Sequence, residues 1–146
     1  MKSLALFLLL AAAALLRADP VEISNQDAQK LWVALNQIPE GFTVANAMIA
    51  ADDATALLPK VQAYERAMSA RMRALKVTQA MLDRHDDSPA ALQYVAEAED
   101  AGGRVVTVDL ARFDLTPEEI SKVRVSVLAV LRQYLKPLPP PPAKTK

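Results

Sequence analysis

The chain has 146 residues and no cysteine, which excludes disulfide bonds and thiol chemistry from its structure and activity. Lys and Arg number 17, as do Asp and Glu, and removal of the signal peptide predicted below takes away Lys2 and Arg17, leaving 15 basic and 17 acidic side chains. So small a net charge creates no global field for nucleic acid or anionic lipid, and we expect no nucleic-acid partner.

Residues 1–18, MKSLALFLLLAAAALLRA, have the layout of a secretory signal peptide. Lys2 precedes an unbroken apolar run from Leu4 to Leu16, and the small residue Ala18 offers a cleavage site. The apolar run would span only about 20 Å as a helix, short of the roughly 30 Å of bilayer hydrocarbon, which favours a cleaved signal over an uncleaved anchor. We therefore expect a periplasmic or secreted protein with no stable membrane span after signal cleavage.

The rest of the chain predicts a single helical domain over residues 19–136 and a flexible proline-rich tail over 137–146. Ser24 stands where an N-cap is expected, and apolar residues then recur at spacings of three and four. This pattern predicts a helix over about 25–37, which Pro39 stops.

Two more helices are expected in the middle of the chain. Thr43 can cap an alanine-rich segment, and Pro59 then opens a long helix that continues to about residue 85, because proline is tolerated in a first turn. Ser88 caps the next helix, and the glycine pair at 102–103 ends it.

The stretch RVVTVDLARF, residues 104–113, is rich in β-branched residues and is the one candidate strand. A lone strand needs a partner, and only the short segment 21–23 is available, so the sequence leaves open whether 104–110 is strand or helix. Thr116 and Glu119 then form a capping box that opens a last helix. The apolar face of that helix carries Ile120, Val123, Val127, Leu131 and Tyr134.

These elements predict an all-α fold. We expect a small up-and-down helical bundle of about four to five helices, with one long central helix and one short strand-like segment near 104–110.

The long helix has two apolar sides when its residues are placed at about 100° each. The bulky side carries Val61, Tyr64, Met68, Met72, Leu75 and Leu82. Nearly opposite lies an alanine face made of Ala63, Ala67, Ala70 and Ala74, continued by Val77 and Met81. A helix with two apolar sides should contact neighbours on both, which places it at the centre of the bundle or at the seam of a dimer.

Arg66, Arg73 and Lys76 form a basic stripe on the polar sector of the same helix, and no acidic residue lies between Arg66 and Leu82. With the alanine face, this stripe is the predicted binding surface for a protein partner or a second copy. The alternative is a solvated face that pairs with the acidic helix over residues 97–100.

Met68 and Met72, with His85 further along, raise the question of a soft-metal site, since thioether and imidazole ligands suit copper and related ions. On one straight helix the methionines and the histidine point in different directions, so we interpret the methionines as core residues. The remaining metal hypothesis is a divalent-ion site of His85 with Asp83 and Asp87, whose alternative is a helix exit followed by a capped loop. The leading interpretation includes no metal and no cofactor.

Few residues suggest catalysis. The only histidine lies in an Asp-rich loop, and an acidic pair such as 52–53 could do acid and base work but does not differ from ordinary turn acids. The aromatic residues Trp32 and Tyr94 could line a pocket, yet they are interpreted as core anchors. We therefore predict that the protein is not an enzyme.

The stretch LTPEEI, residues 115–120, resembles the LTxxQ element of the small periplasmic chaperones of the Spy and CpxP type. Glu119 stands where that element has glutamine, and the chain has one copy rather than two. The same residues also fit a generic capping box. The resemblance implies an exported all-helical protein that binds unfolded clients.

The leading functional hypothesis is an exported, non-catalytic binding or structural protein of the cell envelope that acts through protein contacts. The alternatives are a chaperone of the Spy and CpxP type and a metal-binding periplasmic protein that uses His85.

Overall fold

A computed structural model describes residues 18–37, 42–112 and 114–133. The predicted signal peptide as far as Arg17 and the predicted tail over 137–146 lie outside these residues. The described residues contain two strands and six helices, so they are mostly helical, whereas the sequence predicted an all-α bundle of about four to five helices. Among them, no helix is both long enough and apolar enough to cross a membrane.

The two strands form a small antiparallel sheet. Strand β1 (Asp19–Ser24) pairs with β2 (Val105–Leu110), and Ile23 lies opposite Val106. Ile23 on one strand and Val108 and Leu110 on the other are buried, because alternate side chains of a strand point to the same face. The candidate strand and its partner near 21–23 are thus both confirmed.

Helix α2 (Asn25–Asn36) follows β1 without a loop, and the prediction of a helix near 25–37 is confirmed. The side chain of Ser24 accepts a hydrogen bond from the amide of Asp27, which satisfies one of the free donors at the helix start. The helix buries Ala28, Leu31, Ala34 and Leu35.

Helix α3 (Val44–Leu75) is one continuous helix of 32 residues, capped by Thr43 as predicted. The prediction that Pro59 opens a new helix is wrong, because Pro59 lies inside α3. An interior proline costs a helix about 3 kcal/mol. Leu57 and Val61 flank the proline and are both buried, while Pro59 itself is exposed, so packing on the inner side holds the helix through this position.

The C-terminal end of α3 also differs from the prediction, which continued the helix to about residue 85. Lys76 adopts a left-handed conformation with φ 56°, and the amide of Val77 donates to the carbonyl of Met72. This is a helix stop of the kind that glycine usually provides. Helix α4 (Gln79–Asp83) is a separate short helix, so the continuation of the alanine face beyond residue 75 is also wrong.

Helix α5 (Pro89–Gly103) begins at the Ser88 cap and ends at the glycine pair, as predicted. The last predicted helix is instead two short ones, α6 (Pro117–Lys122) and α7 (Val125–Leu131). The break at Val123 has extended backbone, which suits the β-branched run in this segment. The predicted apolar face is nevertheless buried at Val123, Val127 and Leu131, whereas Tyr134 lies outside the described residues.

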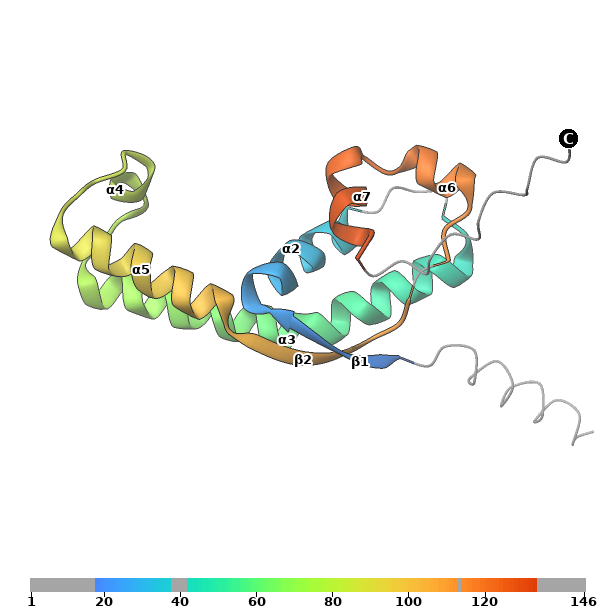
Figure 1. The fold of residues 1–146 in the computed structure, drawn as a ribbon, viewed down its shortest axis with the longest axis horizontal. Helices are drawn as coiled ribbons and strands as arrows, with labels where there is room; N and C mark the ends of the chain where they lie inside the picture. Colours follow the sequence, from blue (N-terminus) through green and yellow to red (C-terminus); the bar gives the residue numbers. More distant parts are fainter. Residues whose placement is uncertain (1–17, 38–41, 113, 134–146) are drawn as a thin grey trace, which may run out of the picture.

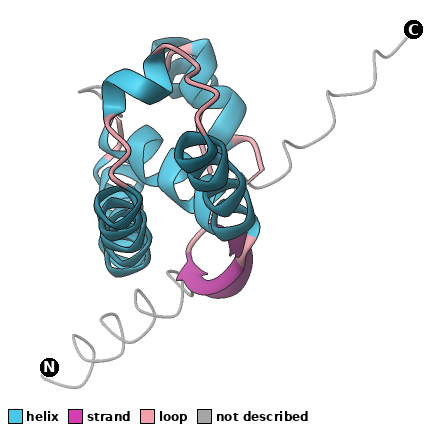
Figure 2. Cartoon of the chain, turned by 90° about the vertical axis from the view of Figure 1, so that its left-hand side faces the viewer, coloured by secondary structure: helices cyan, strands magenta, loops and turns pink. Residues whose placement is uncertain are grey.

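The elements form a head and an arm rather than one bundle (Figure 1). The head consists of the sheet, α2, α6, α7 and α3 as far as Lys60, and it contains the continuous hydrophobic core. The arm, residues 61–103, contains the rest of α3, the short α4, and α5 lying against α3. Figure 2, in which the arm faces the viewer, shows both strands on one side of the helices.

Candidate binding groove on the arm

Small residues let α5 lie close to α3. Ala91 and Gly102 are the buried residues of α5, near its two ends. A Cβ atom added at Gly102 would come within 3.3 Å of the Tyr64 hydroxyl oxygen, closer than most such contacts. Gly102 therefore allows close packing of α5 against α3, in addition to its predicted role at the end of the helix.

An ion pair also joins the two helices of the arm. Arg71 donates one hydrogen bond to Glu97 Oε1 at 2.6 Å and a second to Oε2, in the forked geometry that guanidinium favours. These bonds lower the pKa of Glu97 to about 2, so its carboxylate is charged at neutral pH. The acidic helix thus pairs with α3, but through Arg71, which the sequence analysis did not single out.

A groove of about 560 Å³ opens on one side of the arm, between α4, α5 and the start of α2. Its apolar lining consists of Tyr64, Leu82, Leu92, Tyr94, Val95 and Ala98. Leu92 is 57% exposed and Val95 43% exposed. Among the described residues, only α4, the loop after it, Tyr64 of α3 and the start of α2 border the groove on this side of α5.

Four polar residues complete the lining of the groove. Asp86 and Glu99 supply carboxylates, and His85 and Gln26 complete the polar lining. The Ser88 amide donates to Asp86 at 2.9 Å, and hydrogen bonding by Ser88 lowers the pKa of this carboxyl. The groove therefore combines an apolar floor with a negatively charged rim.

The predicted binding surface lies elsewhere on the arm. All four residues of the alanine face are exposed, whereas Tyr64 and Arg71 of the same helix contact α5. Arg66 and Arg73 line a shallow polar hollow on α3. None of the ion pairs formed within the described residues involves Arg66, Arg73 or Lys76.

The hypothetical metal site has no assembled ligand set in the described part of the chain. No three His, Asp or Glu side chains there come close enough to hold a metal ion. The carboxylate of Asp83 accepts a hydrogen bond from Gln79, and His85 follows α4 with φ 53° and is exposed, as is Asp87.

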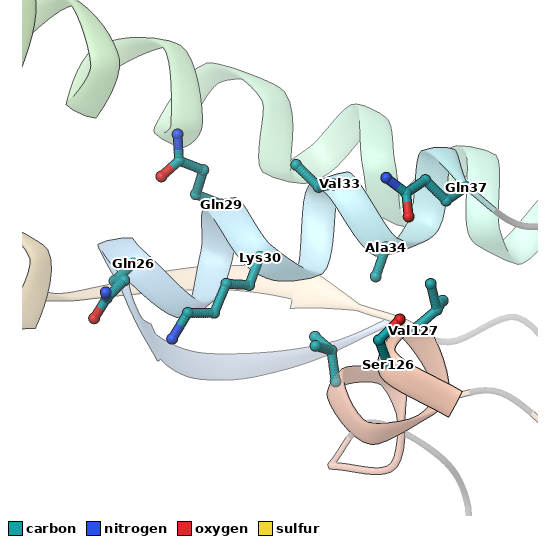
Figure 3. Close-up of a pocket in the computed structure, with 9 residues that line it drawn as sticks. Gln26, Gln29, Lys30, Val33, Ala34, Gln37, Ser126 and Val127 are labelled. Atoms are coloured by element: carbon teal, nitrogen blue, oxygen red, sulfur yellow. The ribbon is translucent and has the colours of Figure 1, made fainter. Parts of the chain in front are cut away.

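A second hollow, of about 380 Å³, lies between α2 and α7 (Figure 3). Gln26, Lys30 and Val33 line it from α2, and Val127 lines it from α7. Gln26 also lines the groove on the arm, so the two hollows share this residue at the N-terminal end of α2.

The groove was not predicted from the sequence, although α5 carries a signal for it. Ala91 and Gly102 face α3, while Leu92 and Val95 place large apolar side chains on a further side of the same helix. A second apolar side on a short helix indicates a second contact. Tyr94 lines the groove rather than anchoring the core.

The chain matches no protein-family model, no curated protein and no solved structure.

Proposed function

We propose that this is an exported, non-catalytic binding protein whose groove holds an apolar segment of a protein partner. The observation that carries the proposal is the exposure of Leu92 and Val95 side by side in one groove. Contiguous exposed apolar surface bordered by polar groups is typical of protein interaction sites. Here Asp86 and Glu99 supply such a border.

The architecture of the arm supports this proposal. The continuous hydrophobic core lies in the head and contains no residue of the arm. Within the arm, the buried residues are Val61, Val77, Ala91 and Gly102. A partner seated against Leu92 and Val95 would remove apolar surface from water, and burial of that surface is the main driving force for association.

The test replaces Val95 by aspartate. We expect this variant to bind a permanently unfolded probe, reduced and carboxymethylated α-lactalbumin, at least about tenfold more weakly than the wild type, because a charge would be buried in the apolar floor. Fluorescence anisotropy of the labelled probe measures the affinity. Ala96→Asp is the matched control, since Ala96 is exposed and outside the groove lining. Equal loss in both variants, or no binding by either the wild type or a chain ending at Gln133, would exclude the groove as the binding site. The same measurement tests the client binding implied by the resemblance to Spy and CpxP.

Self-association through the alanine face is a second candidate function. It is favoured by the exposure of all four alanines on one side of α3, because small side chains allow two helix backbones to approach closely. Met48, 54% exposed on the same helix, adds apolar surface towards the head.

For this candidate we expect a dimer in the wild type and a monomer in Ala70→Glu, because the substitution places a charge at the seam. Size-exclusion chromatography with light scattering gives the two masses. Ser69→Glu, which adds the same charge in the neighbouring polar hollow, should remain dimeric. A monomeric wild type would end the self-association hypothesis.

A further inference from the structure

The chain itself contains a segment whose chemistry suits the groove. Residues 134–146 follow the last described residue, Gln133, and include the run Leu138 to Pro142, LPPPP. Consecutive prolines favour the polyproline II conformation, which loses little entropy on binding. Lys136 precedes this run, and Lys144 and Lys146 follow it.

The groove offers what a basic polyproline segment needs. Tyr64 and Tyr94 supply aromatic surface to the lining, and Leu92 and Val95 supply exposed apolar surface. Proline-rich segments dock into grooves with such aromatic linings. The carboxylates of Asp86 and Glu99, from the two ends of the lining, are opposite in charge to the flanking lysines.

We propose that the groove binds the chain's own segment Leu138–Pro142, so that the tail covers Leu92 and Val95 within the same molecule. This inference rests on the proposed function, because it names an occupant for the same groove. Five residues of polyproline II span about 16 Å at 3.1 Å per residue. The part of α5 from Leu92 to Gly103, which borders the groove, also spans about 16 Å at 1.5 Å per residue.

The place where the described chain ends favours binding within one molecule. Helix α7 packs against α2 and, with it, forms the hollow that shares Gln26 with the groove. The residues from Gln133 to Leu138 can extend up to about 17 Å. Val130, three residues before Gln133, lines the hollow that shares Gln26 with the groove, so this stretch of chain starts within three residues of that hollow.

Paramagnetic relaxation tests the proposal. Because the chain has no cysteine, Ala143→Cys provides a single site for a nitroxide label in the full exported protein. We expect the amide signals of Leu92, Val95 and Ala98 to lose most of their intensity when the label is oxidised. Signals of Thr55, on the exposed side of α3 in the head, should keep theirs. Val95→Asp should restore the groove signals, and Ala96→Asp should not.

Three outcomes would overturn the inference. The first is unchanged intensity at the groove with the oxidised label. The second is equal signal loss after serine replaces all four prolines from Pro139 to Pro142. The third is signal loss only when labelled protein is mixed with unlabelled, isotope-enriched protein, since the contact would then lie between molecules.

Measurements with the unfolded probe separate this inference from the proposed function. If the tail covers the groove, a chain ending at Gln133 should bind the probe more tightly than the full chain. Probe binding without any signal loss at the groove would contradict only the inference. Signal loss at the groove, with no probe bound by the shortened chain, would contradict only the proposed function.

Discussion

Replacing Glu119 by glutamine should lower the free energy of unfolding by about 2–3 kcal/mol, because buried backbone donors would lose an acceptor. Glu119 is 2% exposed. Its Oε1 accepts from the amide of Thr43 at 2.8 Å, and its Oε2 accepts from the amide of Thr116 at 2.8 Å. The side chain of Asn46 also donates to this carboxylate. Glutamine has one acceptor oxygen, so its NH2 group would face one of these donors.

Glu119 joins the start of α3 to the start of α6, so the substitution should weaken the head as a whole. Denaturant unfolding followed by the fluorescence of the single tryptophan, Trp32, which packs on the head core, measures the change. Glu118→Gln is the control: Glu118 is exposed and pairs with Lys122, and such surface pairs contribute at most about 1 kcal/mol. Equal effects of the two substitutions would contradict a special role for Glu119.

The effect of Glu119→Gln should also depend on pH. Burial raises the pKa of Glu119, but hydrogen bonds from Thr116, Thr43 and Asn46 outweigh it and bring the pKa down to about 2. A carboxyl with a lowered pKa stabilises the fold above its unfolded pKa of 4.5 and loses this contribution as the pH falls through 2. The difference between wild type and variant should therefore be complete at pH 6 and shrink in stronger acid.

The same residue shows what the sequence could and could not predict. The capping box of Thr116 and Glu119 is local and was predicted correctly. The bonds to Thr43 and Asn46 join residues more than 70 positions apart in the sequence, so no local pattern predicts them. The two oxygens of Glu119 accept from two separate backbone amides, those of Thr43 and Thr116, and a glutamine at this position has only one acceptor oxygen.

Helix ends were predictable only where residue type carries the signal. Ser24, Thr43 and Ser88 are good N-caps, and all three begin helices as predicted. Lys76 ends α3 in a left-handed conformation that lysine rarely adopts. The sequence therefore carries no signal for this end, and the predicted helix runs past it to about residue 85. The predicted helix therefore included His85, which in the structure follows α4 and borders the groove.

Burial, likewise, could not be predicted for the acidic pair 52–53. Asp52 is exposed, whereas Asp53 is 4% exposed and accepts a hydrogen bond from the amide of Ala111 at 2.8 Å. Burial raises the pKa of Asp53 from 3.8 to about 6; the Ala111 bond opposes this rise, and the charge of Asp52 adds to it. A carboxyl with a raised pKa stabilises the fold below its unfolded pKa and loses this contribution as the pH rises through 6.

Asp53→Asn should therefore stabilise the protein at pH 8, by about 1–2 kcal/mol, and leave its stability little changed at pH 3.5. Asparagine keeps an oxygen that can accept from Ala111 and removes a charge whose burial costs on the order of 2–3 kcal/mol above pH 6. Part of that gain is lost because the new amide donors are also buried. Unfolding by denaturant at a series of pH values, with Trp32 fluorescence as the signal, measures both stabilities.

The change in the free energy of unfolding between pH 4 and 6 shows whether Asp53 is the group that ionises. The wild type should lose stability relative to Asp53→Asn as the pH rises through this range, because only the wild type must ionise a buried carboxyl. Asp52→Asn should shift this loss only slightly, since Asp52 acts on its neighbour through charge alone. A constant difference between wild type and Asp53→Asn from pH 3.5 to 8 would show that Asp53 ionises as readily in the folded chain as in the unfolded one.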